Sequence, residues 1–226
     1  MSIFSKKVKK SELRCEHRHT IDEHPGCFAS GMVKESKKEP ELWYQDLGMK
    51  IGYLDIETDG LVADFNTMLT WCIKDKGGKV YHDEVTKEDL FNGTTDQRIV
   101  KSCIEKLREY KIICTYYGTG FDIPFLRAKA LRYDLDFPEY GDLYHFDIYY
   151  TVRSKLCISR KSLDNACDYL GIVGKTKIDK DVWRKAKYGD KQAIKGVLEH
   201  NIGDVEILEI LHDKLTGFRK WIKRSV

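Results

Sequence analysis

Long apolar runs are absent from this sequence. No stretch approaches the roughly 20 apolar residues that a membrane-spanning helix needs, so we expect no membrane partner. The basic N-terminus, MSIFSKKVKKSELR, lacks a following apolar stretch, which argues against a secretory signal. Internal repeats and low-complexity segments are also missing. The composition, 42% hydrophobic and 33% charged over 226 residues, is typical of a soluble globular protein.

A strong charge of one sign is also lacking. The net charge of +3 neither indicates nor opposes a polyanionic partner, because the local charge distribution matters more than the sum. The seven cysteines are an odd number without a secretion signal, which favours a reducing, cytoplasmic setting. Analogy with other compact proteins suggests a nucleoid-associated or virus-encoded chain. Five of them lie in apolar segments, as buried free thiols do: Cys72, Cys103, Cys114, Cys157 and Cys167.

The N-terminal segment, residues 1–48, is polar and contains RCEHRHTIDEHPGC. Cys15, His19, His24 and Cys27 offer the two thiolates and two imidazoles of a structural zinc site, with His17 as a further candidate ligand. Because the segment has too few apolar residues to fold alone, we expect one structural Zn²⁺. The alternative is a disordered tail with incidental histidines and cysteines. The ligand spacing does not match a DNA-reading zinc finger.

A second domain is expected over residues 49–226. Apolar patterning predicts strands at 50–57, 68–75, 79–85, 111–117 and 145–152. Helical periodicity is found at 96–110, 121–133, 162–171 and 190–224, the last with a break near Gly217. A meander followed by alternating strands and helices indicates an α/β fold with a mixed sheet flanked by helices. The first strand is apolar on both faces and should be central.

Two acidic residues lie close together on the first strand. Asp55 and Glu57 are two residues apart, so their side chains share one face. Two carboxylates on one face of an apolar strand repel one another unless a cation lies between them. The alternative is that the strand has ended and both are solvated, but Leu54 and Ile56 interleave them.

Two further carboxylates lie on later elements. Asp122 opens the helix at 121–133, where it is either a ligand or only an N-cap. Asp204 follows His200 by four residues, so the two share a helix face, as site residues or as a surface pair. Four carboxylates from separate elements are what two hard divalent cations, Mg²⁺ or Mn²⁺, require for phosphodiester hydrolysis.

Three ordered segments resemble the motifs of a known family. They are LDIETDGL (54–61), TYYGTGFDIPFLRAKA (115–130) and HNIGDVEIL (200–208), and SLDNACDYLGIVGKTKI (162–178) resembles the intervening segment. Residues 49–215 resemble the DEDD 3′→5′ exonucleases, and in particular the proofreading exonuclease domain of family B DNA polymerases. The resemblance implies a ribonuclease H-like fold, with a mixed five-stranded sheet flanked by helices.

The resemblance also implies roles for matching residues. Asp55, Glu57, Asp122 and Asp204 would hold two Mg²⁺ or Mn²⁺ ions. Leu61 would insert against the terminal base, the backbone of Thr58 would lie near the terminal nucleotide, and Phe121 would pack beneath or beside the bound strand.

Two positions depart from the family pattern. The residue four before the last aspartate is usually Tyr in the family B branch, whereas here it is His200; the histidine branch places its histidine five before. We expect His200 to orient or deprotonate the attacking water. Family B domains usually carry Asn at the position of Tyr117, which here either stacks on a base or is a core aromatic.

The resulting expectation is a metal-dependent 3′→5′ exonuclease that releases 5′-mononucleotides from single-stranded DNA or RNA ends. The chain lacks room for a polymerase domain, so proofreading would occur in trans, with a separate polymerase or replication complex. The alternatives are a non-catalytic nucleic-acid-binding or replication-complex subunit and a structure-selective endonuclease. Phosphate contacts are expected from basic residues near the site: Arg127, Lys129, Lys175 and Lys177.

Overall fold

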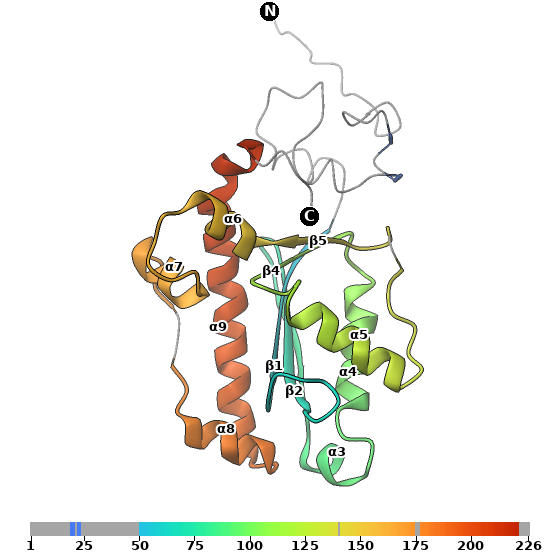
Figure 1. Cartoon of the computed structure of the whole chain (residues 1–226). Coiled ribbons are helices and arrows are strands. Elements are labelled where there is room, and N and C mark those ends of the chain that lie inside the picture. Colours follow the sequence, from blue (N-terminus) through green and yellow to red (C-terminus); the bar gives the residue numbers. More distant parts are fainter. Residues whose placement is uncertain (1–18, 21, 24–49, 140, 175–176, 222–226) are drawn as a thin grey trace, which may run out of the picture.

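The computed structural model describes residues 19–20, 22–23, 50–139, 141–174 and 177–221 (Figure 1). Of the expected zinc ligands, Cys15, His24 and Cys27 therefore lie outside the described residues, as does His17. His19 is described and is exposed. No helix of the described part is long and apolar enough to cross a membrane.

A five-stranded mixed sheet forms the centre of the fold. Its strands are β1 (Ile51–Thr58), β2 (Met68–Asp75), β3 (Val80–Glu84), β4 (Ile112–Thr115) and β5 (Tyr144–Asp147). The spatial order is β3-β2-β1-β4-β5, with antiparallel pairing among the first three strands and parallel pairing of β4 with β1 and of β5 with β4. The prediction that the first strand is central is confirmed.

Helices cover both faces of the sheet. They are α3 (Lys87–Phe91), α4 (Gln97–Leu107), α5 (Asp122–Arg132), α6 (Ile148–Lys155), α7 (Leu163–Tyr169), α8 (Lys180–Lys187) and α9 (Lys191–Leu215). The long helix α9 runs along one face with α6, α7 and α8 on its side, while α4 and α5 cover the other face (Figure 1). The expected break near Gly217 is present, because the 3₁₀ helix η2 (Thr216–Trp221) replaces the α-helix there.

The prediction of a strand over residues 145–152 is wrong in its second half. The strand ends at Asp147, whose carboxylate accepts a hydrogen bond from the Tyr149 amide and so caps α6. Ile148 and Val152 are then buried one helical turn apart. The sequence also left α3 and α8 unpredicted; Thr86 and Asp179 cap them through their side chains.

Alternation along β1 divides its side chains between two hydrophobic cores. Ile51 and Tyr53 pack in the core that includes α6, α7 and most of α9. Leu54 and Ile56 pack in the core that includes α4 and α5. Because side chains two apart share a face, Asp55 continues the face of Ile51 and Tyr53, which is the face covered by α9.

Two buried polar contacts fix α9 on this face. The hydroxyl of Tyr53 lies 2.7 Å from Nδ1 of His212. On the neighbouring strand, Nζ of Lys74 lies 2.7 Å from a carboxylate oxygen of Glu209, with both side chains largely buried. These contacts set how far α9 is displaced along β1, and hence which of its residues face the end of that strand.

The opposite face contains a buried ion pair. Nζ of Lys129 lies 3.0 Å from Oδ2 of Asp96, and their side chains are 6% and 0% exposed. The same carboxylate accepts hydrogen bonds from the amide of Met68 and the hydroxyl of Tyr133. Lys129 is therefore part of the core packing, and the expectation that it contacts phosphate is wrong.

We expect Asp96→Ala to destabilise the domain by about 3–5 kcal/mol, because it leaves the ammonium of Lys129 buried without its counter-charge. Urea unfolding would measure this change. The matched control is Glu105→Ala, which breaks the exposed pair between Lys101 and Glu105 at 3.8 Å and should cost no more than about 0.5 kcal/mol. Equal losses for the two variants would contradict the assignment.

Candidate active site

The two acidic residues of β1 lie beside the first residue of α5. Asp55 and Glu57 are half-buried near the end of the strand. The amide of Ile56, between them, donates a hydrogen bond of 3.1 Å to Oδ1 of Asp122. Asp122 is only 3% exposed. The N-cap position of α5 belongs to Phe121, which makes no capping hydrogen bond, and the carboxylate of Asp122 contacts β1 through the Ile56 amide.

Helix α9 brings two more side chains to the same place. Nε2 of His200 lies 3.7 Å from Oε1 of Glu57 and 3.9 Å from Oδ2 of Asp204. One ligand atom from each of these three residues falls within 4.8 Å of the others. Asp204 is 7% exposed, so it does not form a surface pair with His200. Residues from β1, α5 and α9 thus converge at the end of the central strand.

The electrostatics of this cluster disfavour charge without a cation. The pKa of Asp122 is raised to about 7, mainly by burial and to a smaller extent by the nearby carboxylate of Asp147, against the lowering effect of the Ile56 amide. Burial likewise raises the pKa of the Cys72 thiol, and the charges of Asp55 and Glu57 add to the shift. Both carboxylates of β1 therefore act on the same neighbouring thiol.

This donor set fits a hard divalent cation. Carboxylate oxygens predominate, as Mg²⁺ and Mn²⁺ prefer, and one imidazole lies among them. The donors Glu57, His200 and Asp204 are already close enough together to contact a single ion. A cation would also offset the repulsion among the carboxylates. Asp55 shares the face of Glu57 on β1, and Asp122 is bonded to the Ile56 amide between them, so both are available to extend this donor set.

Sequence reasoning missed Asp147, which holds the loop that precedes Asp122. Its carboxylate accepts hydrogen bonds from the amides of Tyr117, at 2.8 Å, and Thr119, at 2.9 Å. These bonds hold the loop that leads from β4 to α5. A lone aspartate inside an expected strand carried no signal for this role, because the partner loop lies 28–30 residues earlier in the chain.

Tyr117 lies at the surface of that loop. It exposes 48% of its area, so the alternative that it is a core aromatic is wrong. Its φ of +66° falls in the left-handed region, which a tyrosine rarely adopts. Its ring lies above Gly120, where an added Cβ would come within 2.5 Å of it. Such backbone strain in a surface residue is typical of a functional site.

The other expected substrate-binding residues flank the cluster. The hydroxyl of Thr58 donates a 2.6 Å hydrogen bond to the carbonyl of Gly60, which shapes the turn after β1. In that turn Leu61 is 81% exposed. Phe121 is partly buried, with its ring 5.7 Å from that of Phe125. Trp183 of α8, which the sequence did not indicate, presents its ring to His200 at 6.4 Å between centroids.

We expect Asp122 to make the metal-free domain less stable as pH rises. Its folded pKa of about 7 lies above the ordinary 3.8, so between these values the folded state keeps a proton that the unfolded state has released. Stability then falls by up to about 4 kcal/mol over this range. In Asp122→Asn this part of the pH dependence should disappear. Urea unfolding in a chelator, from pH 4 to 7, measures it; parallel profiles would contradict the assignment.

Comparison with known proteins gives consistent results for fold and family. The chain is similar to the solved structure of the family B DNA polymerase from Pyrobaculum calidifontis, with a TM-score of 0.63 and 20% identity over 82% of this chain and 26% of the polymerase. It is also 36% identical over 63 residues to a DNA polymerase of Methanocaldococcus jannaschii. These 63 residues are 27% of this chain and 4% of that protein. The chain thus spans only a small part of either polymerase.

The family match extends over most of the domain. A model described as RNase H superfamily matches residues 52–216, which include all of α9 and the whole sheet except the first residue of β1. The order of strands and the helices on both faces agree with the ribonuclease H-like fold expected from the sequence motifs. The chain therefore belongs to the RNase H superfamily.

Proposed function

We propose that the domain is a metal-dependent 3′→5′ exonuclease that hydrolyses single-stranded DNA ends, or RNA ends, to 5′-mononucleotides. The observation that carries the proposal is the cluster of Glu57, His200 and Asp204 in an RNase H superfamily fold, with Asp55 on the same face of β1 and Asp122 bonded to the Ile56 amide between the two β1 carboxylates. Both polymerase similarities support a nucleic-acid substrate.

The four carboxylates would hold two Mg²⁺ or Mn²⁺ ions. When bound, such ions supply activation of water and stabilisation of the leaving oxygen. The role of the protein is to fix the carboxylates on three separate elements before substrate arrives. The hydrogen bond from the Ile56 amide holds Asp122 in this arrangement, and the helical spacing of α9 holds Asp204 beside His200.

His200 is proposed as the base of the reaction. Its Nε2 faces Glu57 and Asp204. A water bound beside these two proposed metal ligands would therefore lie within reach of Nε2. An imidazole can orient that water and accept its proton at Nε2. The ring of Trp183 lies beside the imidazole, with 87° between the two ring planes.

The turn after β1 supports exonuclease rather than endonuclease action. It is closed by hydrogen bonds between Asp59 and Thr67, and by an ion pair of 3.1 Å from Lys187 to Asp59. This rigid turn presents the exposed side chain of Leu61, which would insert against the terminal base, with the Thr58 backbone nearby and Phe121 beneath or beside the strand. An open groove for internal cleavage would not require such a projection.

The wider context is also a proposal. The similarity to two polymerases, each matched over a small part of its length, favours a role in replication or repair beside a separate polymerase, in the cytoplasm. Arg127 is exposed on α5 and remains a candidate phosphate contact. For residues 1–48 we propose a structural Zn²⁺ on Cys15, His19, His24 and Cys27, of which only His19 is described.

We expect the wild type to shorten a 5′-labelled single-stranded DNA from its 3′ end in Mg²⁺ or Mn²⁺, and to stop in EDTA. Asp55→Ala should abolish the ladder, because it removes a metal ligand from β1. Gel analysis of the products measures this, and matched RNA identifies the preferred sugar. Binding without cleavage of either polymer would favour the non-catalytic subunit, and internal cuts would favour the endonuclease.

We expect His200→Gln to lower the turnover rate by about 10²–10⁴-fold, as loss of a general base does, and to remove the limb of the pH–rate profile that reports its titration. The control is His82→Gln, at an exposed histidine on the edge strand β3, which should behave as wild type. A variant at position 200 with normal rate and pH profile would show that His200 is not the base.

A further inference from the structure

Four tyrosines form a connected cluster beside the candidate active site. Tyr149 is at its centre, with ring centroids 5.9 Å from Tyr116, 4.9 Å from Tyr117 and 5.3 Å from Tyr150. Tyr116 is anchored, because its hydroxyl donates to the carbonyl of Lys161. Within the described part of the chain, the hydroxyls of Tyr117, Tyr149 and Tyr150 form no hydrogen bond. These three rings are therefore not fixed by the polar contacts that buried tyrosines usually make.

The cluster is tied directly to the loop that precedes Asp122. The carboxylate of Asp147 accepts from the amides of Tyr117 and Thr119 on this loop, and also from the amide of Tyr149 at the start of α6. One side chain thus fixes the first turn of α6 relative to the loop. A nucleic-acid strand bound at Asp122 would therefore find the tyrosines at a fixed position relative to that aspartate.

The contacts among these three tyrosines leave ring faces accessible to a ligand. The planes of Tyr117 and Tyr149 meet at 73°, and those of Tyr149 and Tyr150 at 78°. Neither pair is stacked face to face, so ring faces are left for a planar ligand. Tyr117 is 48% exposed and the other two are partly exposed.

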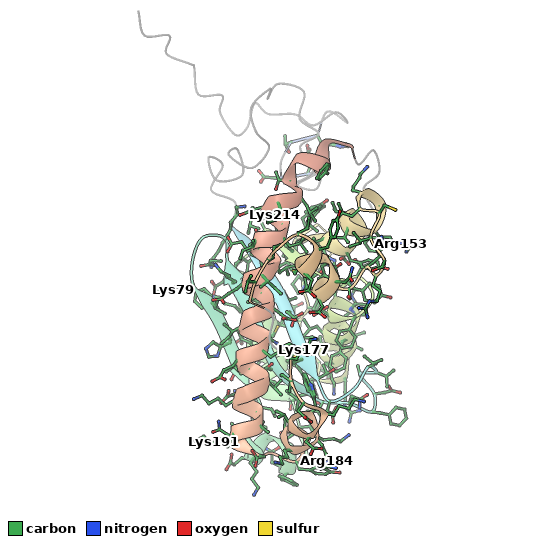
Figure 2. All side chains as sticks on the ribbon, turned by 90° about the vertical axis from the view of Figure 1, so that its left-hand side faces the viewer. Lys79, Arg153, Lys177, Arg184, Lys191 and Lys214 are labelled. Atoms are coloured by element: carbon green, nitrogen blue, oxygen red, sulfur yellow. The ribbon has the colours of Figure 1, made fainter. Side chains whose placement is uncertain are left out.

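A cation extends this surface. Arg153 lies four residues after Tyr149 and three after Tyr150, so it shares their side of α6. Arg153 is exposed, forms no ion pair with a carboxylate of the described residues, and lies on the outer side of the molecule (Figure 2). Aromatic rings beside an unpaired guanidinium are the chemistry that binds unpaired bases and the phosphates between them.

We propose that Tyr117, Tyr149, Tyr150 and Arg153, here called the tyrosine track, bind the single-stranded nucleic acid that leads to the active site. Bases stack on the three rings and the guanidinium contacts a backbone phosphate. This rests on the proposed function only in taking the bound strand to be the one that is cleaved. Stacking tolerates every base, so the track holds a strand without selecting its sequence.

The test combines Tyr149→Leu, Tyr150→Leu and Arg153→Gln in an Asp55→Ala background, where binding is measured without cleavage. Fluorescence anisotropy with a long single strand, as DNA and as RNA, should show a Kd raised at least about tenfold. The plot of log Kd against log salt should flatten by about 0.7 for the lost phosphate contact. Replacing the tyrosines with Phe and keeping Arg153 should retain binding.

The matched control carries Tyr169→Leu, Tyr188→Leu and Arg184→Gln. These tyrosines are 69% and 66% exposed on other elements, and Arg184 lies at the other end of the molecule from Arg153 (Figure 2). The control should bind as wild type does. If the combined variant does not fold, Arg153→Gln alone still tests the change in salt dependence.

Normal binding by the track variant would overturn the proposal, as would a wild type that binds no single strand. A wild type that binds but never cleaves would overturn the proposed function alone; the track would then stand if its variant loses binding. In an active enzyme, the track variant should raise KM for a long strand by a larger factor than it lowers kcat, because the track contacts the bound strand and not the reacting phosphate.

Discussion

The position of α9 across the face of β1 determines most of this structure. Ile51, Tyr53, Asp55 and Glu57 lie on one face of the central strand, and the residues of α9 opposite them, together with Asp122 of α5, make up the candidate site. The contact of Tyr53 with His212 and the pairing of Lys74 with Glu209 place the helix along the strand. A slip of one residue would turn α9 by about 100° and remove both the packing of its apolar residues and the approach of Asp204. The core and the candidate site thus depend on a single register.

The same register concentrates negative charge at one end of the strand. In the metal-free domain this arrangement opposes folding, since Asp122 is buried with a raised pKa. Glu57 and Asp204 also lie close together, one on each side of the His200 ring nitrogen Nε2. Two large apolar clusters, one on each face of the sheet, offset this cost. A divalent cation would remove it, so binding of the ion and stability of the fold should be thermodynamically linked.

Much of the fold was predictable because its signals are local. The apolar run of β1 and the periodicity of α4 each predicted their element correctly, and α7 lies within the helix expected at 162–171. The spacing of Asp55, Glu57, His200 and Asp204 along their elements also indicated which side chains share a face. The strand assigned to residues 145–152 was wrong because β-prone tyrosines hid a helix that depends on the cap at Asp147. The roles of Asp147 and Trp183 depend on contacts between distant segments, which periodicity does not report.

The left-handed backbone at Tyr117 has a consequence for how this sequence tolerates change. Glycine or asparagine fits that conformation with less strain, so either residue would make the isolated fold easier to form. Both would remove the ring that contacts Tyr149 from the loop between β4 and α5. Laboratory selection for thermal stability alone would therefore tend to replace Tyr117, whereas selection for the proposed binding of single-stranded nucleic acid would retain it. At position 117, the residue that favours stability of the fold thus differs from the residue that favours the proposed binding.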